Sequence, residues 1–132
     1  MQKSRDLRVR SFRFAVDTVA FGRFVVPSDP VLRRLALQLV DAAGSVGANL
    51  EEAAAGQSKA DFIARNCIAL KEARESRFWL RLLAAAEPEL RTRTQPLSEE
   101  ASELVAMLVA TIKTARSRPT RGLFRDRSEE GT

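Results

Sequence analysis

The chain has 132 residues, of which 45% are hydrophobic and 30% are charged, and its formal net charge is +5. A chain of this length is expected to form one domain that buries a core without disulfides or metals. It contains no histidine and one cysteine, Cys67, which excludes histidine-based catalysis, histidine-ligated zinc and an intrachain disulfide. Cys67 lies among apolar residues, so we predict a buried, unreactive thiol.

No apolar run in the sequence approaches the length that spans a bilayer. The first ten residues, MQKSRDLRVR, lack the apolar stretch of a signal peptide. We therefore expect a cytoplasmic protein with no membrane partner. The positive net charge favours an acidic partner, although a bias in codon composition would explain the excess of arginine equally well.

From about Arg8 the sequence predicts a first helix with apolar residues on two faces. One face carries a stripe that we interpret as facing the core, made of Val9, Phe12, Val16 and Val19. The opposite face, where a monomeric bundle would present polar groups to water, carries Phe14, Phe21 and Val25. We predict that this second face is a subunit interface, and the alternative is a loose edge of the bundle that covers it.

Helix boundaries are clearest around the second and third predicted helices. Asp29 suits an N-cap and Pro30 a first helical turn, so the second helix should begin there. Gly56 followed by Ser58 indicates the end of this helix and the N-cap of a third one. Because the two helices are long and the connection is short, they should lie antiparallel and share a buried face.

A fourth helix is predicted after a polar connector that runs from Pro88 to Pro96. Ser98 suits its N-cap. Its core-facing stripe consists of Ala101, Leu104, Val105, Leu108, Ile112 and Ala115. We assign residues 1–118 to one bundle domain and residues 119–132 to a flexible polar tail.

Three segments occur in one order between Ser45 and Leu83: SVGANLEEA, QSKADF and IALKEARESRFWLRLL. They resemble the signature of the bacterial 23S rRNA-intervening-sequence protein family, and the matching block runs from about Gln38 to Leu83. The resemblance implies a four-helix bundle that assembles as a homopentamer, without enzymatic activity and with an unsettled biochemical role. A related branch of the family comprises accessory proteins of retroelement reverse transcriptases, which bind nucleic acid.

The hairpin turn departs from the pattern of other family branches. Those branches carry Ala-Glu-Gly and two basic residues where this chain has Glu51, Glu52 and Ala53 and then Gly56 and Gln57. A phosphate-binding loop at this turn is therefore disfavoured.

Charged residues crowd the middle of the third predicted helix. The family match covers them together with a tryptophan, which suggests a polar network at a subunit contact; the residues concerned are Glu72, Arg74, Glu75, Arg77 and Trp79. A solvated charged face is the alternative.

The paired carboxylates do not form a recognisable catalytic or metal motif. Di-metal helical bundles use Glu-x-x-His motifs, and the pairs Glu51/Glu52 and Glu72/Glu75 have no histidine. We predict that they form ion pairs, and we expect no catalytic residue, metal or cofactor. The enzyme alternative is a carboxylate-based, metal-dependent site at these four residues.

The predicted architecture is all-α, an antiparallel up-down-up-down four-helix bundle. In this topology the start of the first helix and the end of the fourth helix lie at the same end of the molecule. We predict that this basic end contacts an RNA or DNA backbone through Arg8, Arg10, Arg13, Arg116, Arg118 and Arg121. The leading hypothesis is thus an oligomeric binding or scaffold module, and the alternative is a structural homo-oligomer with no nucleic-acid partner.

Overall fold

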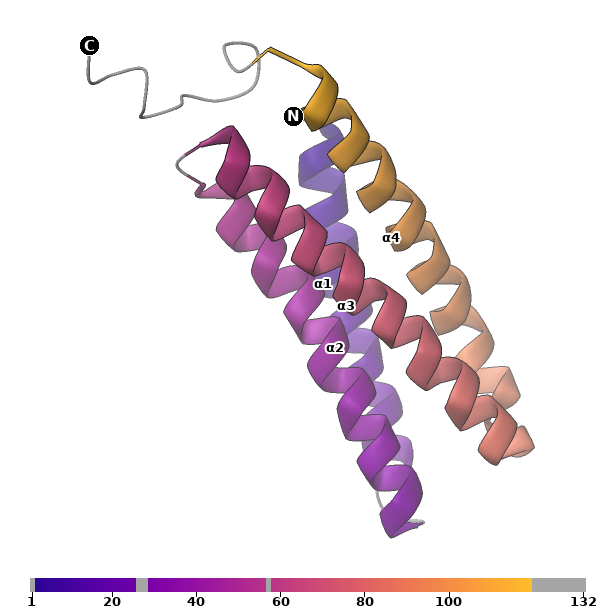
Figure 1. Ribbon diagram of the computed structural model, residues 1–132. Helices are drawn as coiled ribbons and strands as arrows, with labels where there is room; N and C mark the ends of the chain where they lie inside the picture. Colours follow the sequence, from indigo (N-terminus) through magenta and orange to yellow (C-terminus); the bar gives the residue numbers. More distant parts are fainter. Residues whose placement is uncertain (1, 26–28, 57, 120–132) are drawn as a thin grey trace.

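In a computed structural model of the chain, four long helices form an antiparallel up-down-up-down bundle (Figure 1). The structure describes residues 2–25, 29–56 and 58–119. The helices are α1 (Gln2–Val25), α2 (Pro30–Ala54), α3 (Lys59–Ala86) and α4 (Arg91–Ser117), with a short 3-10 helix, η1 (Pro88–Leu90), before α4. Each long helix packs against the next in sequence, and α1 closes the bundle by packing against α4. The predicted fold class is confirmed.

Both helices of the central hairpin begin at the predicted capping residues. The Asp29 carboxylate accepts hydrogen bonds from the backbone N–H groups of Val31, at 2.8 Å, and Leu32, at 3.4 Å. The Ser58 hydroxyl accepts one from the backbone N–H of Asp61, at 3.1 Å. These side chains satisfy backbone donors that the first helical turn leaves without intrahelical partners.

Replacing Asp29 by Ala should therefore lower the free energy of unfolding by about 1 kcal/mol, the usual loss for an N-cap. Urea denaturation followed by circular dichroism measures the change. Asp17→Ala is a suitable control because Asp17 is exposed within α1 and caps no helix. Equal losses for the two variants would contradict the capping role of Asp29.

The structure reverses the predicted faces of α1. The residues assigned to a subunit interface are buried in the core of the chain itself: Phe14, Phe21 and Val25. The residues assigned to the core are instead exposed, with exposed fractions of 49% for Val9, 70% for Phe12, 51% for Val16 and 39% for Val19. The predicted core face and the predicted interface face of α1 are therefore interchanged.

The core face of α1 also carries two small polar residues. Ser11 and Thr18 are completely buried there. Their hydroxyls donate to backbone carbonyls of the same helix, Ser11 to Arg8 at 3.0 Å and Thr18 to Ala15 at 2.7 Å. Because both hydroxyls are satisfied within the helix, their burial leaves no unpaired polar group.

The fourth helix begins earlier than predicted. The segment assigned to a polar connector forms η1 and the first two turns of α4, so Ser98 lies inside the helix rather than at its cap. Pro96 is also inside α4. Proline has no backbone N–H, so one hydrogen bond near the start of α4 is missing. The loss is tolerated because Thr92 and Arg93, in the preceding turn, are exposed to water. The predicted core stripe of α4 is confirmed, because all six of its residues are buried.

Within the described residues, no helix is both long enough and apolar enough to cross a membrane. Pro119, the first residue of the predicted tail, is exposed. Residues 120–132 lie outside the part of the chain that the structure describes.

Candidate nucleic-acid interface

A groove runs along the bundle between α3 and α4, and we call it the α3–α4 groove. On α3 it extends from Cys67 to Ala84, about 25 Å along the helix axis. Its floor and walls include the apolar side chains of Leu70, Phe78, Leu80, Val109 and Ile112.

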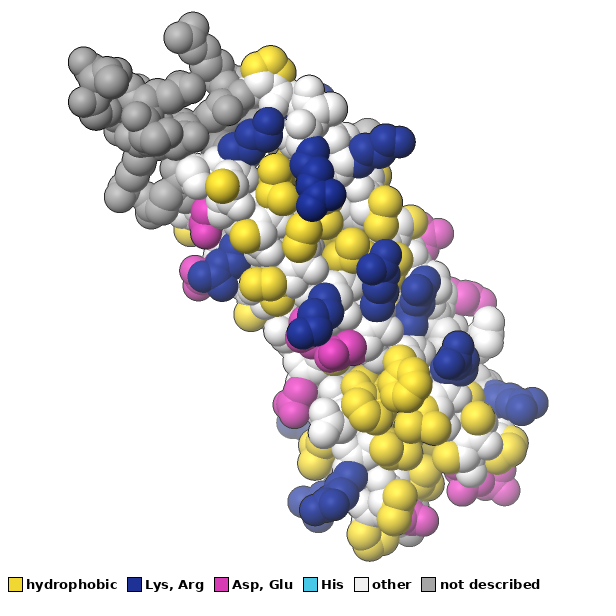
Figure 2. Space-filling model, viewed as in Figure 1, with side chains coloured by type: hydrophobic (Ala, Val, Ile, Leu, Met, Phe, Trp, Pro, Cys, Tyr) yellow, Lys and Arg dark blue, Asp and Glu magenta, His cyan; other side chains and the backbone are white. Residues whose placement is uncertain are grey.

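Basic side chains dominate the rim of this groove. Figure 2 shows lysines and arginines gathered over α3 and α4, with hydrophobic side chains between them. The basic lining residues are Lys71, Arg74, Arg77, Arg81, Arg91, Lys113 and Arg116. Among the described lining residues, Glu75 is the only acidic one. No ion pair within the described residues involves any of the seven basic side chains, although Lys71 lies close enough to Glu72 to influence the pKa of its carboxyl.

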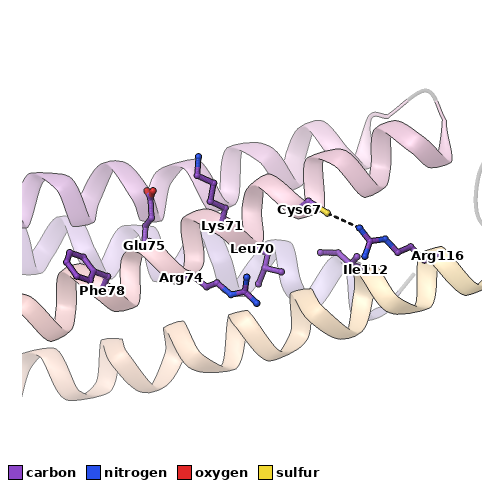
Figure 3. A pocket seen from close by; sticks show the side chains of 8 residues that line it. All are labelled: Cys67, Leu70, Lys71, Arg74, Glu75, Phe78, Ile112 and Arg116. Carbon is purple, nitrogen blue, oxygen red and sulfur yellow. Dashed lines mark hydrogen bonds between the residues drawn. The ribbon is translucent and has the colours of Figure 1, made fainter.

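The helical repeat of α3 places these cations in a row. Arg74, Phe78 and Arg81 are separated by four and three residues, which puts them on one side of the helix. Figure 3 shows Arg74 and Leu70 directed toward α4, whereas Lys71 and Glu75 point away from it. The groove therefore has an arginine-rich edge next to α4 and a mixed edge on the outer side of α3.

Cys67 lies at one end of the groove and is half-buried, which corrects the prediction of a buried thiol. Its sulfur accepts a hydrogen bond from Arg116 Nη2, with a distance of 3.7 Å between the two atoms (Figure 3). This contact brings the guanidinium of α4 across to α3 and closes that end of the groove.

The structure divides the residues of the predicted basic end. The start of α1 and the end of α4 lie at the same end of the bundle, as predicted (Figure 1). However, Arg10 forms a two-point ion pair with Glu100, at 2.6 and 3.0 Å, and this bond is the main cause that raises the pKa of Arg10. More than four helical turns of α4 separate Glu100 from Arg116, about 24 Å. Arg10 is thus neither free nor close to the end of α4.

The other predicted contacts have different surroundings. Arg8 lies 3.6 Å from Glu51, and Arg13 is exposed on α1. Arg118 is exposed, and its backbone carbonyl accepts a hydrogen bond from Lys59 Nζ at 2.7 Å. Arg121 lies outside the described residues. Of the six arginines, Arg116 is the one that lines the α3–α4 groove.

The charged residues predicted to form one network on α3 separate into two groups. Arg74 and Arg77 line the groove next to α4. Glu72 is half-buried; burial raises the pKa of its carboxyl, Glu75 adds to the increase and Lys71 opposes it. Trp79 packs against the core and meets the exposed Phe78 edge to face, with ring centroids 5.2 Å apart. The predicted polar network at a subunit contact stays a prediction.

The paired carboxylates also differ from the prediction of ion pairs. Glu51 has a basic neighbour, Arg8, at 3.6 Å. Within the described residues, Glu52, Glu72 and Glu75 form no ion pair. No group of three or more cysteine or acidic side chains in the described part of the chain is arranged to hold a metal ion.

A second surface feature is the apolar stripe on the outside of α1. Its four residues continue at both ends into arginines with alternating spacings of four and three, giving the series Arg5, Val9, Phe12, Val16, Val19 and Arg23. This is the spacing of a helix–helix contact seam. We call these six residues the α1 stripe.

Sequence reasoning missed the α3–α4 groove because its cations come from two different helices. A signal was present, since Lys71, Arg74, Arg77 and Arg81 recur every three or four residues. Recognising the groove also required the position of α4, which the sequence placed too late.

Comparison with known proteins gives matches of two kinds. The sequence matches the family described as 23S rRNA-intervening sequence protein over residues 3–110. It is also similar to a crystal structure from Bacteroides thetaiotaomicron VPI-5482, described as a protein with unknown function from the S23 ribosomal protein family. The two chains are 34% identical, with a TM-score of 0.77, and the match covers 84% of this chain and 98% of the other. No curated protein matches the sequence.

Proposed function

The chain belongs to the 23S rRNA-intervening sequence protein family, and we propose that it is a non-enzymatic, self-associating module that binds a nucleic-acid backbone in the α3–α4 groove. The observation that supports this proposal is the row of basic side chains along the groove, none of which forms an ion pair within the described residues. We therefore place the nucleic-acid contact on one side of the bundle and not at its basic end.

Phosphate is the ligand that best matches this lining. Guanidinium groups donate paired hydrogen bonds to phosphate oxygens, and such charge-assisted bonds are stronger than neutral ones. Binding also releases counterions from the nucleic acid, so affinity depends on the number of phosphates that the protein neutralises. Four basic side chains on α3, from Lys71 to Arg81 over about 15 Å, and three more on α4 offer several such contacts from one chain.

Fluorescence anisotropy of labelled oligonucleotides tests this function directly. The wild-type protein should bind at about 50 mM salt and lose affinity steeply by about 200 mM, because each phosphate contact contributes to the salt dependence. Absence of binding at the lower salt concentration would remove nucleic acid from the account and favour a structural homo-oligomer.

Self-association is proposed on the basis of the α1 stripe. Exposing large apolar side chains to water costs roughly 1.5–3 kcal/mol each when exposure is complete. Phe12, at 70% exposure, therefore carries a substantial unfavourable contribution in an isolated chain. Covering the stripe with another protein surface removes it.

A second copy of this chain is the occupant that we propose for the α1 stripe. The stripe ends in Arg5 and Arg23, so two stripes packed antiparallel would place arginines against each other. The outer side of α3 offers the complementary combination, because the exposed Ile68 is followed at helical spacing by Glu72 and Glu75. A contact between α1 of one copy and α3 of the next is head to tail and can close into a ring. The family resemblance implies five copies.

We expect light scattering at micromolar concentration to give a mass several times the 14.6 kDa of one chain. Val16→Glu should lower that mass toward the monomer, because it places a charge in the middle of the α1 stripe. Val109→Glu is the matched control, since Val109 is 43% exposed on α4 and lies outside the stripe. A monomeric wild type, or an unchanged Val16→Glu assembly, would contradict this interface.

A further inference from the structure

We infer that the α3–α4 groove selects single-stranded RNA, with one base stacked on Phe78 and the neighbouring phosphates held by Arg74 and Arg81. This inference rests on the proposed function and adds the class of nucleic acid to it. Three features of the groove support it: an exposed aromatic ring, the arginines on either side of that ring, and hydroxyl groups on the facing helix.

Phe78 is an aromatic side chain in the middle of the basic groove. It is 48% exposed, although burial would be favourable for a ring of this size. It lines both halves of the groove, the half that ends at Cys67 and the half that includes Thr94 and Ser98. The edge-to-face contact with Trp79 fixes the position of the ring.

The arginines around Phe78 are placed to hold a backbone that passes over the ring. Arg74 precedes it by four residues and Arg81 follows it by three, so both lie one helical turn away on the same side of α3. An aromatic ring between cations is the arrangement with which proteins bind single strands, because the bases stack on the ring while the cations follow the phosphates.

This arrangement favours a single strand over a duplex. In a duplex, the faces of each base are covered by its stacked neighbours and are not available to a protein ring. A duplex could use the arginines of the groove but could not use Phe78. Single-strand binding therefore depends on Phe78, and duplex binding depends on charge alone.

The α4 wall of the groove provides a reason to prefer RNA. Ser98 and Ser102 line the same part of the groove as Arg77 and Arg81. Neither serine hydroxyl has a hydrogen-bond partner among the described residues, so both can donate to or accept from a ligand. The ribose 2′-hydroxyl is the group that distinguishes RNA from DNA, and it both donates and accepts.

The test compares wild type, Phe78→Leu and Phe24→Leu on a fluorescently labelled oligouridylate of about 20 nucleotides and on a duplex of the same length. Phe24→Leu is the matched control, because Phe24 is equally exposed, at 50%, and lies under Arg93 on the other side of α4. We expect Phe78→Leu to weaken oligouridylate binding by about tenfold, the size of one lost base stack. Duplex binding should stay unchanged, as should both affinities of the control.

Trp79 supplies an independent readout, since it is the only tryptophan of the chain and touches Phe78. Its fluorescence should change when oligouridylate is added to the wild type and should not change when the duplex is added. A change of equal size with both ligands would overturn the stacking role of Phe78.

A third arm tests the preference for RNA. Wild type should bind oligouridylate more tightly than single-stranded oligodeoxyuridylate, and the double variant Ser98→Ala, Ser102→Ala should remove that difference. Equal wild-type affinities for the two strands would overturn the assignment to RNA.

The outcomes separate this inference from the function on which it rests. If Phe78→Leu binds the single strand as well as wild type does, while groove-arginine variants lose binding, the inference is wrong and the proposed function stands. If wild type binds no oligonucleotide, both are wrong.

Discussion

Replacing Phe14 by Ala should lower the free energy of unfolding by about 3–5 kcal/mol, the usual cost of removing a buried phenylalanine from a packed core. Phe14 is 1% exposed and is the largest completely buried side chain of the described core. Phe12, two residues earlier on the same helix, is 70% exposed. Phe12→Ala should therefore change the unfolding free energy of an isolated chain by less than about 0.5 kcal/mol.

This pair of variants tests the orientation of α1 with identical chemistry at two positions. The measurement should be made by urea denaturation in the Val16→Glu background, because self-association would otherwise contribute to the apparent stability of Phe12 variants. A larger loss for Phe12→Ala than for Phe14→Ala would restore the orientation of α1 that the sequence suggested.

Removing three arginines from the α3–α4 groove should have the largest effect on binding. In Arg74→Ala, Arg77→Ala, Arg81→Ala, up to three phosphate contacts are lost, each contributing about 0.7 to the salt slope for a single strand. Affinity for oligouridylate at about 0.1 M salt should then fall by about 100-fold, and the salt slope should decrease by about 2. All three residues are exposed, so the variant should retain its helical circular dichroism and its thermal midpoint.

The control is Arg13→Ala, Arg33→Ala, Arg34→Ala, which removes the same charge from exposed positions on α1 and α2 outside the groove. These three arginines also form no ion pair within the described residues. We expect a small loss of affinity, since only the long-range attraction is weakened. Equal losses in the two triple variants would show that net charge, and not the groove, controls binding.

Much of the fold could be predicted because the determinants of α2, α3 and most of α4 are local. Asp29 and Ser58 cap their helices through bonds to residues two or three positions away. The stripe from Ala101 to Ala115 leaves a single apolar face to bury. In both cases the local pattern permits one structure.

The orientation of α1 could not be predicted because both of its faces are apolar. The face that is buried also carries Ser11 and Thr18, whose hydroxyls bond within the helix. A helical wheel treats such residues as polar, whereas in the structure they are satisfied and buried. The start of α4 could not be predicted because a proline usually marks a helix boundary, whereas Pro96 lies inside α4.

The candidate site was predicted less well than the fold. Sequence reasoning used the net charge of the chain ends and could not include carboxylates that approach from other helices, such as Glu51 beside Arg8 and Glu100 beside Arg10. Conversely, the cations of α3 were assigned to a network with Glu72 and Glu75. Figure 3 shows Arg74 directed toward α4, and this orientation depends on the packing of the two helices.

Lysine footprinting of the wild-type protein is the most direct test of where nucleic acid binds. Lys71 and Lys113 line the α3–α4 groove, whereas Lys59 lies at the start of α3 and bonds to the backbone of Arg118. Acetylation with and without saturating oligouridylate, followed by mass spectrometry of the peptides, gives the protection of each amine. We expect strong protection of Lys113, weaker protection of Lys71, which points away from α4 (Figure 3), and little change at Lys59; an unprotected Lys113 in a saturated complex would contradict binding in the groove.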